Sequence, residues 1–247
     1  MDDDFAALID AIGSEMVCCT AQCPGIVCKQ KTGQIPRCLF LELEKSTGEK
    51  RDGKRGVVIV GLNPGAAKDT EKQHYLMHGS ADEHPNCNEL YDAVKGWMRL
   101  KGLVSEPYYL KLYKFLGTLN SLPSQPGITG PILWTELVKC ESTPEEGKLP
   151  VQTISECTKG FLFREMELVP CDWPIIAAGK DAYDFLRIQF PRRKIIGVPH
   201  PTGWGNEELF HRLFDPYGGN SLVAKFADEA DNVLRGWKPH VWLKSSR

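Results

Sequence analysis

VVIVGLNPG, residues Val57 to Gly65, is the stretch that indicates the fold most directly. Its first four residues are β-branched, which is the composition of a strand buried on both faces. The run ends in a turn rich in Gly and Pro, and in open α/β folds ligands bind where strands reach their carboxyl ends. Asn63 stands in this turn and offers both a donor and an acceptor. Asn, Pro and Gly are also ordinary turn residues, so the turn alone decides nothing.

Three later stretches have the same form, a short apolar run followed at once by polar or cysteine residues. They are Ile132–Val138, Pro174–Ala178 and Lys194–Val198. Strands separated by helix-containing crossovers predict a mostly parallel sheet with helices on both faces. We therefore expect an α/β fold, a three-layer α/β/α sandwich with a central, mostly parallel four-stranded sheet. Its polar strand ends converge on one edge, which predicts a site.

The segments between the strands predict helices and loops. Apolar spacing predicts two helices, Glu89–Leu103 and Tyr108–Leu119, and we expect two more at Val151–Leu168 and Lys180–Ile188. Residues 66–89 are polar without a clear period and predict an active-site loop, and Ser121–Pro131 predicts a linker turn. We expect one domain over residues 1–247, with a cysteine-containing N-terminal segment at 1–55 and a surface tail at 236–247.

The composition is that of a soluble globular protein, with 42% apolar and 25% charged residues and a formal net charge of −2. No overall basic charge indicates nucleic acid, although contacts to phosphate need only one face. No apolar run approaches the roughly 20 residues of a membrane span. The acidic start, Met1–Gly13, predicts a short amphipathic helix rather than a signal peptide. We expect a cytoplasmic monomer.

The nine cysteines need their own explanation. Five lie within 21 residues, namely Cys18, Cys19, Cys23, Cys28 and Cys38. Cys140 and Cys157 are separated by 16 residues, and Cys87 and Cys171 stand apart. In a reducing compartment, clustered cysteines favour a metal or catalytic site. The alternative is that most of them are small buried apolar side chains.

Two motifs at strand ends and two in the middle of the chain carry a family resemblance. GLNPG after the first strand and HPTG, residues 200–203, after the last resemble motifs of the uracil-DNA glycosylase superfamily. GLNPG is similar to the version in the mismatch-specific and single-strand-selective branches. WTELVKC, residues 134–140, followed by Cys157 and by FLFREMELVPCDWPIIAAGKDA, resembles the iron–sulfur branch called family 4. The resemblance covers roughly residues 18–215.

This resemblance implies a DNA glycosylase that hydrolyses the N-glycosidic bond of a flipped-out pyrimidine in single- or double-stranded DNA. Asn63 would orient the attacking water, and His200, across the base pocket, would donate to the departing base. The remaining pocket residues would be Gly61, Leu62, Tyr75, Glu136 and Thr202, with Tyr75 stacked under the base. Neither GLNPG nor HPTG offers a Lys nucleophile, so a monofunctional enzyme of base-excision DNA repair is expected.

The same resemblance implies contacts to DNA outside the pocket. Trp204 would enter the gap left in the duplex, and Gly203 would allow its loop to approach DNA closely. Arg212, together with Arg192, Arg193 and Lys194, would contact phosphates. Single basic residues are more often only solvated, so these contacts are the weaker part of the expectation.

The cysteines acquire a role from the resemblance as well. It implies a structural [4Fe–4S] cluster held by Cys23, Cys28, Cys140 and Cys157, with zinc as the alternative. Cys23 and Cys28 have four residues between them, where the branch has a tight CxxC, so Cys18, Cys19 or Cys38 can replace either. The centre would pin the N-terminal segment to the middle of the domain.

Glu136 departs from the family pattern. The iron–sulfur branch has at this position an Asn that reads uracil through a donor and an acceptor. An ionised carboxylate only accepts, so it suits the exocyclic amine of cytosine and repels uracil O4 unless it is protonated. Glu136 therefore leaves two substrates open, a uracil-type base or a modified cytosine. Hypermodified cytosine in phage DNA would make defence against foreign DNA the enzyme's role.

Two other classes of function compete with this reading. One is a non-catalytic nucleic-acid-binding member of the same fold, in which the metal cluster is only structural. The other is a generic α/β hydrolase of nucleotides or small molecules. The chain has neither a phosphate-binding G-x-x-x-x-G-K-[ST] loop nor a G-x-S-x-G elbow, so this last reading ranks lowest.

Overall fold

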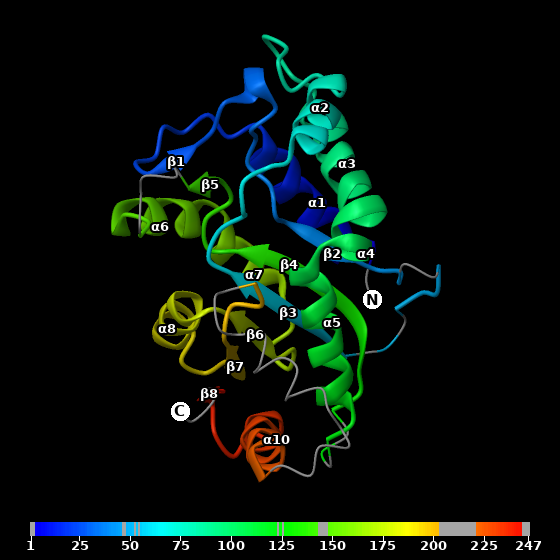
Figure 1. Cartoon of the computed structure of the whole chain (residues 1–247), viewed down its shortest axis with the longest axis vertical. Helices are drawn as coiled ribbons and strands as arrows, with labels where there is room; N and C mark the ends of the chain where they lie inside the picture. Colours follow the sequence, from blue (N-terminus) through cyan, green and yellow to red (C-terminus); the bar gives the residue numbers. More distant parts are fainter. Residues whose placement is uncertain are drawn as a thin grey trace. The chain divides into compact units, whose positions relative to one another are not determined.

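The computed structural model describes residues 3–45, 48–51, 53, 55–122, 124, 126–142, 148–202 and 221–243. Within these ranges, six strands form one sheet in the order β2-β4-β3-β6-β7-β8 (Figure 1). They are β2 (Phe40–Glu42), β3 (Arg55–Gly61), β4 (Ile128–Glu136), β6 (Ile175–Ala178), β7 (Ile195–Val198) and β8 (His240–Trp242). The pairs β3–β6, β6–β7 and β7–β8 are parallel. The expected α/β class with a mostly parallel central sheet is confirmed.

The sheet is wider than the expected four strands. The four predicted strands are β3, β4, β6 and β7, and β2 and β8 were not predicted. β8 lies in the expected surface tail and pairs with β7, with His240 opposite Ile195. Both additional strands have three residues, which is too short to show a period of two. β4 begins at Ile128, so the end of the expected linker turn belongs to a strand.

The helices largely follow the predicted spacing. Their bounds are α1 (Asp3–Val17), α2 (Asp69–Met77), α3 (Cys87–Trp97), α4 (Leu103–Ser105), α5 (Pro107–Asn120), α6 (Val151–Cys157), α7 (Phe163–Leu168), α8 (Lys180–Gln189) and α10 (Ser221–Leu234). Short π-helical segments, Met98–Gly102 and Thr158–Leu162, connect α3 to α4 and α6 to α7. A 3₁₀ turn spans Gln30–Thr32, and β1 (Ile26–Val27) pairs antiparallel with β5 (Glu141–Ser142).

The expectation of a loop throughout residues 66–89 was wrong, because α2 lies there. Asp69 and Glu71 occupy its first turn, where negative charge is favourable against the helix dipole. Tyr75 is its buried residue. A helix that buries one side chain shows no apolar stripe at helical spacing, so the sequence pattern could not reveal it.

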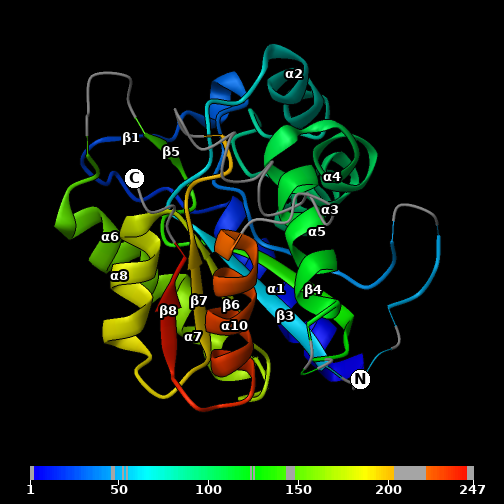
Figure 2. The same ribbon diagram turned by 60° about the horizontal axis from the view of Figure 1, so that its bottom comes forward.

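The chain groups into two compact units. The first comprises residues 1–41, 62–101 and 134–170, and the second comprises 42–61, 102–133 and 171–247. In the second unit α8 packs against β6 and β7, and α10 packs against β7 and β8. Figure 2 shows α8 and α10 on opposite sides of these strands, as a sandwich requires. In the first unit α1 packs against α3 and α7.

Close packing explains one glycine of the sheet. A Cβ on Gly197 of β7 would overlap the rings of Tyr183 from α8 and Trp242 from β8. Those two rings lie 5.4 Å apart between centroids, so they cover the strand at this point. In the described part of the chain, the helices fall short of the length and apolar character that a bilayer crossing requires.

Candidate active site

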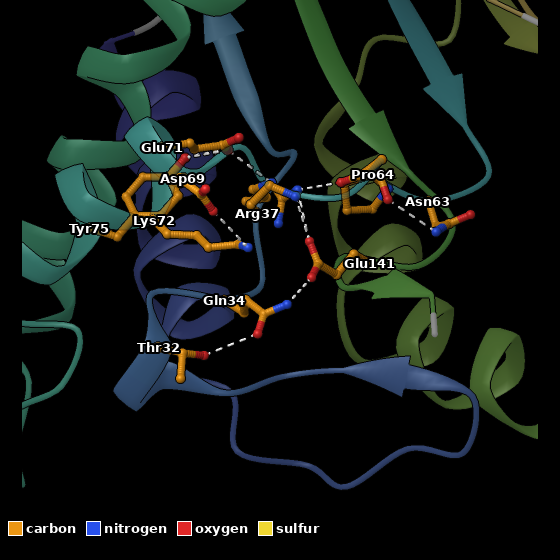
Figure 3. Close-up of polar contacts among 12 residues, drawn as sticks. Thr32, Gln34, Arg37, Asn63, Pro64, Asp69, Glu71, Lys72, Tyr75 and Glu141 are labelled. Carbon is orange, nitrogen blue, oxygen red and sulfur yellow. Dashed lines mark hydrogen bonds and ion pairs between the residues drawn. The ribbon is translucent and has the colours of Figure 1, made fainter. Parts of the chain in front are cut away.

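The loop after β3 carries Asn63, which is half-buried. Its Nδ2 donates to the carbonyl oxygen of Pro64 at 3.1 Å. A carbonyl oxygen can only accept, so the amide NH₂ must face it and Oδ1 must face the other way. Figure 3 shows Oδ1 directed away from Pro64. The arrangement directs a hydrogen-bond acceptor away from the Pro64 carbonyl at the end of the strand.

Three hydrogen bonds to its backbone hold this loop, all of them within the first unit. Val138 N donates to Leu62 O at 2.9 Å. Ala67 N donates to the Glu141 carboxylate at 2.7 Å, and the Arg37 guanidinium donates to Gly65 O (Figure 3). Leu62 itself is half-buried, whereas Gly61 is buried as the last residue of β3. The path of the backbone on both sides of Asn63 is therefore restrained.

Tyr75 belongs to a charged network that reaches the loop through Glu71 and Arg37. It is 1% exposed, and its hydroxyl donates to Glu71 at 2.9 Å. Glu71 in turn lies 3.0 Å from Nε of Arg37. Burial, followed by the charge of Glu71, raises the pKa of the Tyr75 phenol well above its usual value. The residue is thus a neutral donor, and its stacking under a base stays a prediction.

Glu136 is the last residue of β4 and is 7% exposed. Burial raises its pKa from 4.5 to about 8, although Lys139 and Arg37 oppose this shift. Cys38 contributes a side-chain hydrogen bond, while Oε2 is buried and has no partner among the described residues. The carboxyl group is therefore mostly protonated at neutral pH. A protonated carboxyl has one donor and one acceptor, as an amide does.

His200 follows β7 in the second unit. Thr202 N donates to its Nδ1 at 3.4 Å, and Thr202 Oγ1 lies 3.2 Å from the same atom. Because a backbone N–H can only donate, Nδ1 is the acceptor and Nε2 carries the proton of the neutral ring. Burial lowers the pKa of His200, which favours this neutral form. His200 therefore presents one N–H donor.

Helix α5 and the end of β6 fix the surroundings of His200. The ring of Tyr108 lies 5.3 Å from the His200 ring between centroids, and Lys111 Nζ donates to Pro201 O at 2.9 Å. Gly179 N donates to Val198 O at 2.8 Å, which joins the carboxyl ends of β6 and β7. Gly179 has φ of 105°, a conformation that favours glycine.

The cysteines converge in the first unit. Cys19, Cys23, Cys140 and Cys157 line one cavity of about 220 Å³. Cys28 lies beside it, hydrogen-bonded to Cys140, and this bond is the main reason that the pKa of the Cys140 thiol is raised. Burial raises the pKa of Cys157 to about 11.

The structure distinguishes two of the substitutes for Cys23 and Cys28, Cys18 and Cys19. Cys18 forms a disulfide with Cys87, so it is not available as a ligand. Cys19 was expected only as a substitute ligand, and it lines the cavity. Over the described ranges, no group of three or more His, Cys, Asp or Glu side chains has an arrangement that could hold a metal ion. The metal centre stays a prediction.

The expected contacts to DNA are only partly visible. Gly203, Trp204 and Arg212 lie outside the described residues. Arg192 is exposed, whereas Lys194 Nζ donates to Leu234 O at 2.7 Å. Arg193 donates to Trp173 O at 3.5 Å, so the two basic residues that follow Arg192 both donate to backbone carbonyls of their own unit.

The sequence interpretation overlooked Arg37 and Glu141. Arg37 stands in the largely apolar stretch IPRCLFLEL, and a charge in such a run is a signal of a buried, paired side chain. Its partner Glu141 is 104 residues away in the chain, and no local pattern identifies it.

Comparison with known proteins completes the description. A family model of the Uracil DNA glycosylase superfamily matches residues 49–214, which is more than half of the chain. The matched span contains Asn63, Glu136 and His200. A search of curated proteins returns no match.

Proposed function

Because the chain belongs to the uracil DNA glycosylase superfamily, a family of DNA glycosylases, we propose that it hydrolyses the N-glycosidic bond of a flipped-out pyrimidine in DNA. The observation that carries this proposal is the orientation of the Asn63 amide. Its Nδ2 is engaged by Pro64 O, so Oδ1 is the atom that would accept a hydrogen bond from water. An oriented water can attack the sugar as the bond to the base breaks.

His200 supplies the second part of the proposed chemistry. Negative charge develops on the base as it leaves, and a donor aimed at that charge stabilises the transition state. The neutral ring with its proton on Nε2 suits this role, because Thr202 occupies Nδ1. Neither GLNPG nor HPTG contains a lysine, and the proposal is therefore a monofunctional glycosylase without a lyase step.

The protonation state of Glu136 favours one of the two candidate substrates. As a protonated carboxyl at neutral pH it offers one donor and one acceptor, which match O4 and N3–H of a uracil-type base. Only the ionised form would favour the exocyclic amine of cytosine. We therefore propose a uracil-type base as the substrate. A modified cytosine in foreign DNA is the competing outcome.

The cysteine cavity supports a structural metal centre as part of the proposal. Two of its cysteines, Cys19 and Cys23, come from the N-terminal segment, and Cys140 and Cys157 come from the middle of the chain. Cysteine thiolates from different chain segments are the usual ligands of a [4Fe–4S] cluster or of structural zinc, and Cys28, which is hydrogen-bonded to Cys140, is a further candidate ligand. A bound centre would supply cross-linking of the two segments and no step of the hydrolysis.

Mass spectrometry of released bases tests the proposed function. The purified chain is incubated at pH 7 with single- and double-stranded DNAs that carry uracil, hypoxanthine, thymine mismatches or modified cytosines. Release of uracil supports the proposal, and release of modified cytosine alone would move the substrate to the competing class. Tight DNA binding without release of any base would instead identify a non-catalytic member of the family.

A further inference from the structure

Arg37 is a buried arginine, 5% exposed, that contacts the Asn63 loop and two glutamates. Its Nε lies 3.0 Å from Glu71 Oε1, and its Nη2 lies 3.4 Å from Glu141 Oε2. The same Nη2 donates to Gly65 O (Figure 3). Burying a guanidinium away from water costs free energy, and opposite charges close to it offset this cost.

Glu141 holds the same loop at a second point. Its Oε2 accepts from Ala67 N at 2.7 Å, and its Oε1 accepts from the Gln34 side chain. The two charged side chains therefore form hydrogen bonds with the backbone at Gly65 O and Ala67 N, just after Asn63.

Side-chain packing holds only the two ends of this segment, because Pro64 and Ala67 are buried. Gly65 and Ala66 between them are exposed, and a Cβ on Gly65 would have nothing within 4 Å. The contacts of Arg37 and Glu141 therefore act on a part of the loop that packing restrains least. The Pro64 carbonyl, which orients the Asn63 amide, belongs to the peptide unit directly before Gly65.

We propose that Arg37 and Glu141 are positioning residues that hold the Asn63 loop in its hydrolytic geometry. This inference rests on the proposed function, because it assigns a purpose to the water-orienting amide. Neither side chain touches the substrate; both act through the backbone of the loop. A displacement of about 1 Å at such a loop is expected to reduce the rate about 100-fold.

The test compares Arg37→Met with Arg51→Met as a matched control. Arg51 pairs with the buried Glu42 at 2.7 Å and is itself 11% exposed, and the pair belongs to the second unit, whereas the Asn63 loop belongs to the first. Three quantities are measured for each variant: the single-turnover rate of base release, the Kd for DNA, and the hydrogen-exchange rate of the Ala67 amide.

Arg37→Met is expected to lower the single-turnover rate about 100-fold, to leave the Kd for DNA nearly unchanged, and to speed exchange at Ala67. Arg51→Met is expected to lower the melting temperature similarly without either change. Equal rates and equal Ala67 exchange in the two variants would overturn the inference. If Arg37→Met does not fold, Arg37→Lys retains the charge without the two-sided fork and is expected to show smaller losses in the same direction.

The exchange measurement separates this inference from the proposed function. If the wild-type chain releases no base, the proposed function fails, and faster Ala67 exchange in the Arg37 variants still reports the restraint on the loop. If the wild-type chain is active and the Arg37 variants match it, the positioning role alone fails.

Discussion

Lys139 Nζ lies 2.8 Å from Glu165 Oε1, and both side chains are completely buried. Thr135 joins them, since its hydroxyl donates to Glu165 Oε2 at 2.6 Å. This ion pair ties the end of β4 to α7, and the end of β4 carries Glu136 and leads into Cys140. The placement of two site residues therefore depends on one buried pair of charges.

Breaking this pair is expected to destabilise the protein strongly. Glu165→Leu leaves the Lys139 ammonium buried without its carboxylate, which should lower the free energy of unfolding by about 3–5 kcal/mol. The neighbouring Arg164 pairs with Glu15 at the surface, and Arg164→Met should cost less than about 1 kcal/mol. Urea denaturation measures both. Similar small losses in the two variants would show that the buried pair is not a structural anchor.

Glu136 makes stability depend on pH. Its pKa is 4.5 in the unfolded reference and about 8 in the folded chain, so between these values the unfolded state binds fewer protons. The free energy of unfolding should therefore fall as the pH rises from 4.5 to 8. Glu136→Gln removes the titrating group. The free energy of unfolding of the variant should therefore rise relative to that of the wild type as the pH increases over this range. A difference that does not change with pH would mean that Glu136 is ionised throughout.

His200 should remain neutral and active below its ordinary pKa of 6.5, because burial lowers its pKa. Nitrogen NMR of the imidazole at pH 7 is expected to show the proton on Nε2. His200→Ala should reduce the rate of base release about 10²–10³-fold, the effect of removing a preorganised donor. A proton on Nδ1, or an unchanged rate, would exclude His200 as the donor to the base.

The cysteine cavity predicts metal in the purified protein. Cys140→Ser should remove most of the bound metal, whereas Cys171→Ser should retain it, because Cys171 is exposed and does not line the cavity. Elemental analysis measures both, and visible absorbance separates iron–sulfur from zinc. Comparing Cys19→Ser with Cys28→Ser identifies the fourth ligand. Equal metal content in the Cys140 and Cys171 variants would refute the centre at this cavity.

Sequence patterns predicted those parts of the fold whose signal is local. The four central strands are short apolar runs, and Val57 to Val60 are all at most 1% exposed, so their composition reveals them. α2 buries only Tyr75, and β8 has three half-buried residues; neither leaves a periodic apolar pattern.

The site divides in the same way. Asn63 and His200 could be proposed from the sequence because each follows a recognisable strand within a short motif. The restraint from Arg37 and Glu141 joins residues far apart in the chain and exists only after folding. The protonation of Glu136 depends on burial, which its residue type does not reveal, and the raised pKa is why we propose a uracil-type base where the sequence left two substrates open.

The central claim is that Asn63 orients the attacking water, and single-turnover base release by Asn63→Ala tests it most directly. Asn88, which is exposed at the start of α3, supplies the matched control Asn88→Ala. We expect Asn63→Ala to bind DNA as the wild type does and to release base about 10²–10⁴ times more slowly, with Asn88→Ala unchanged. Release by Asn63→Ala at the wild-type rate would contradict the account.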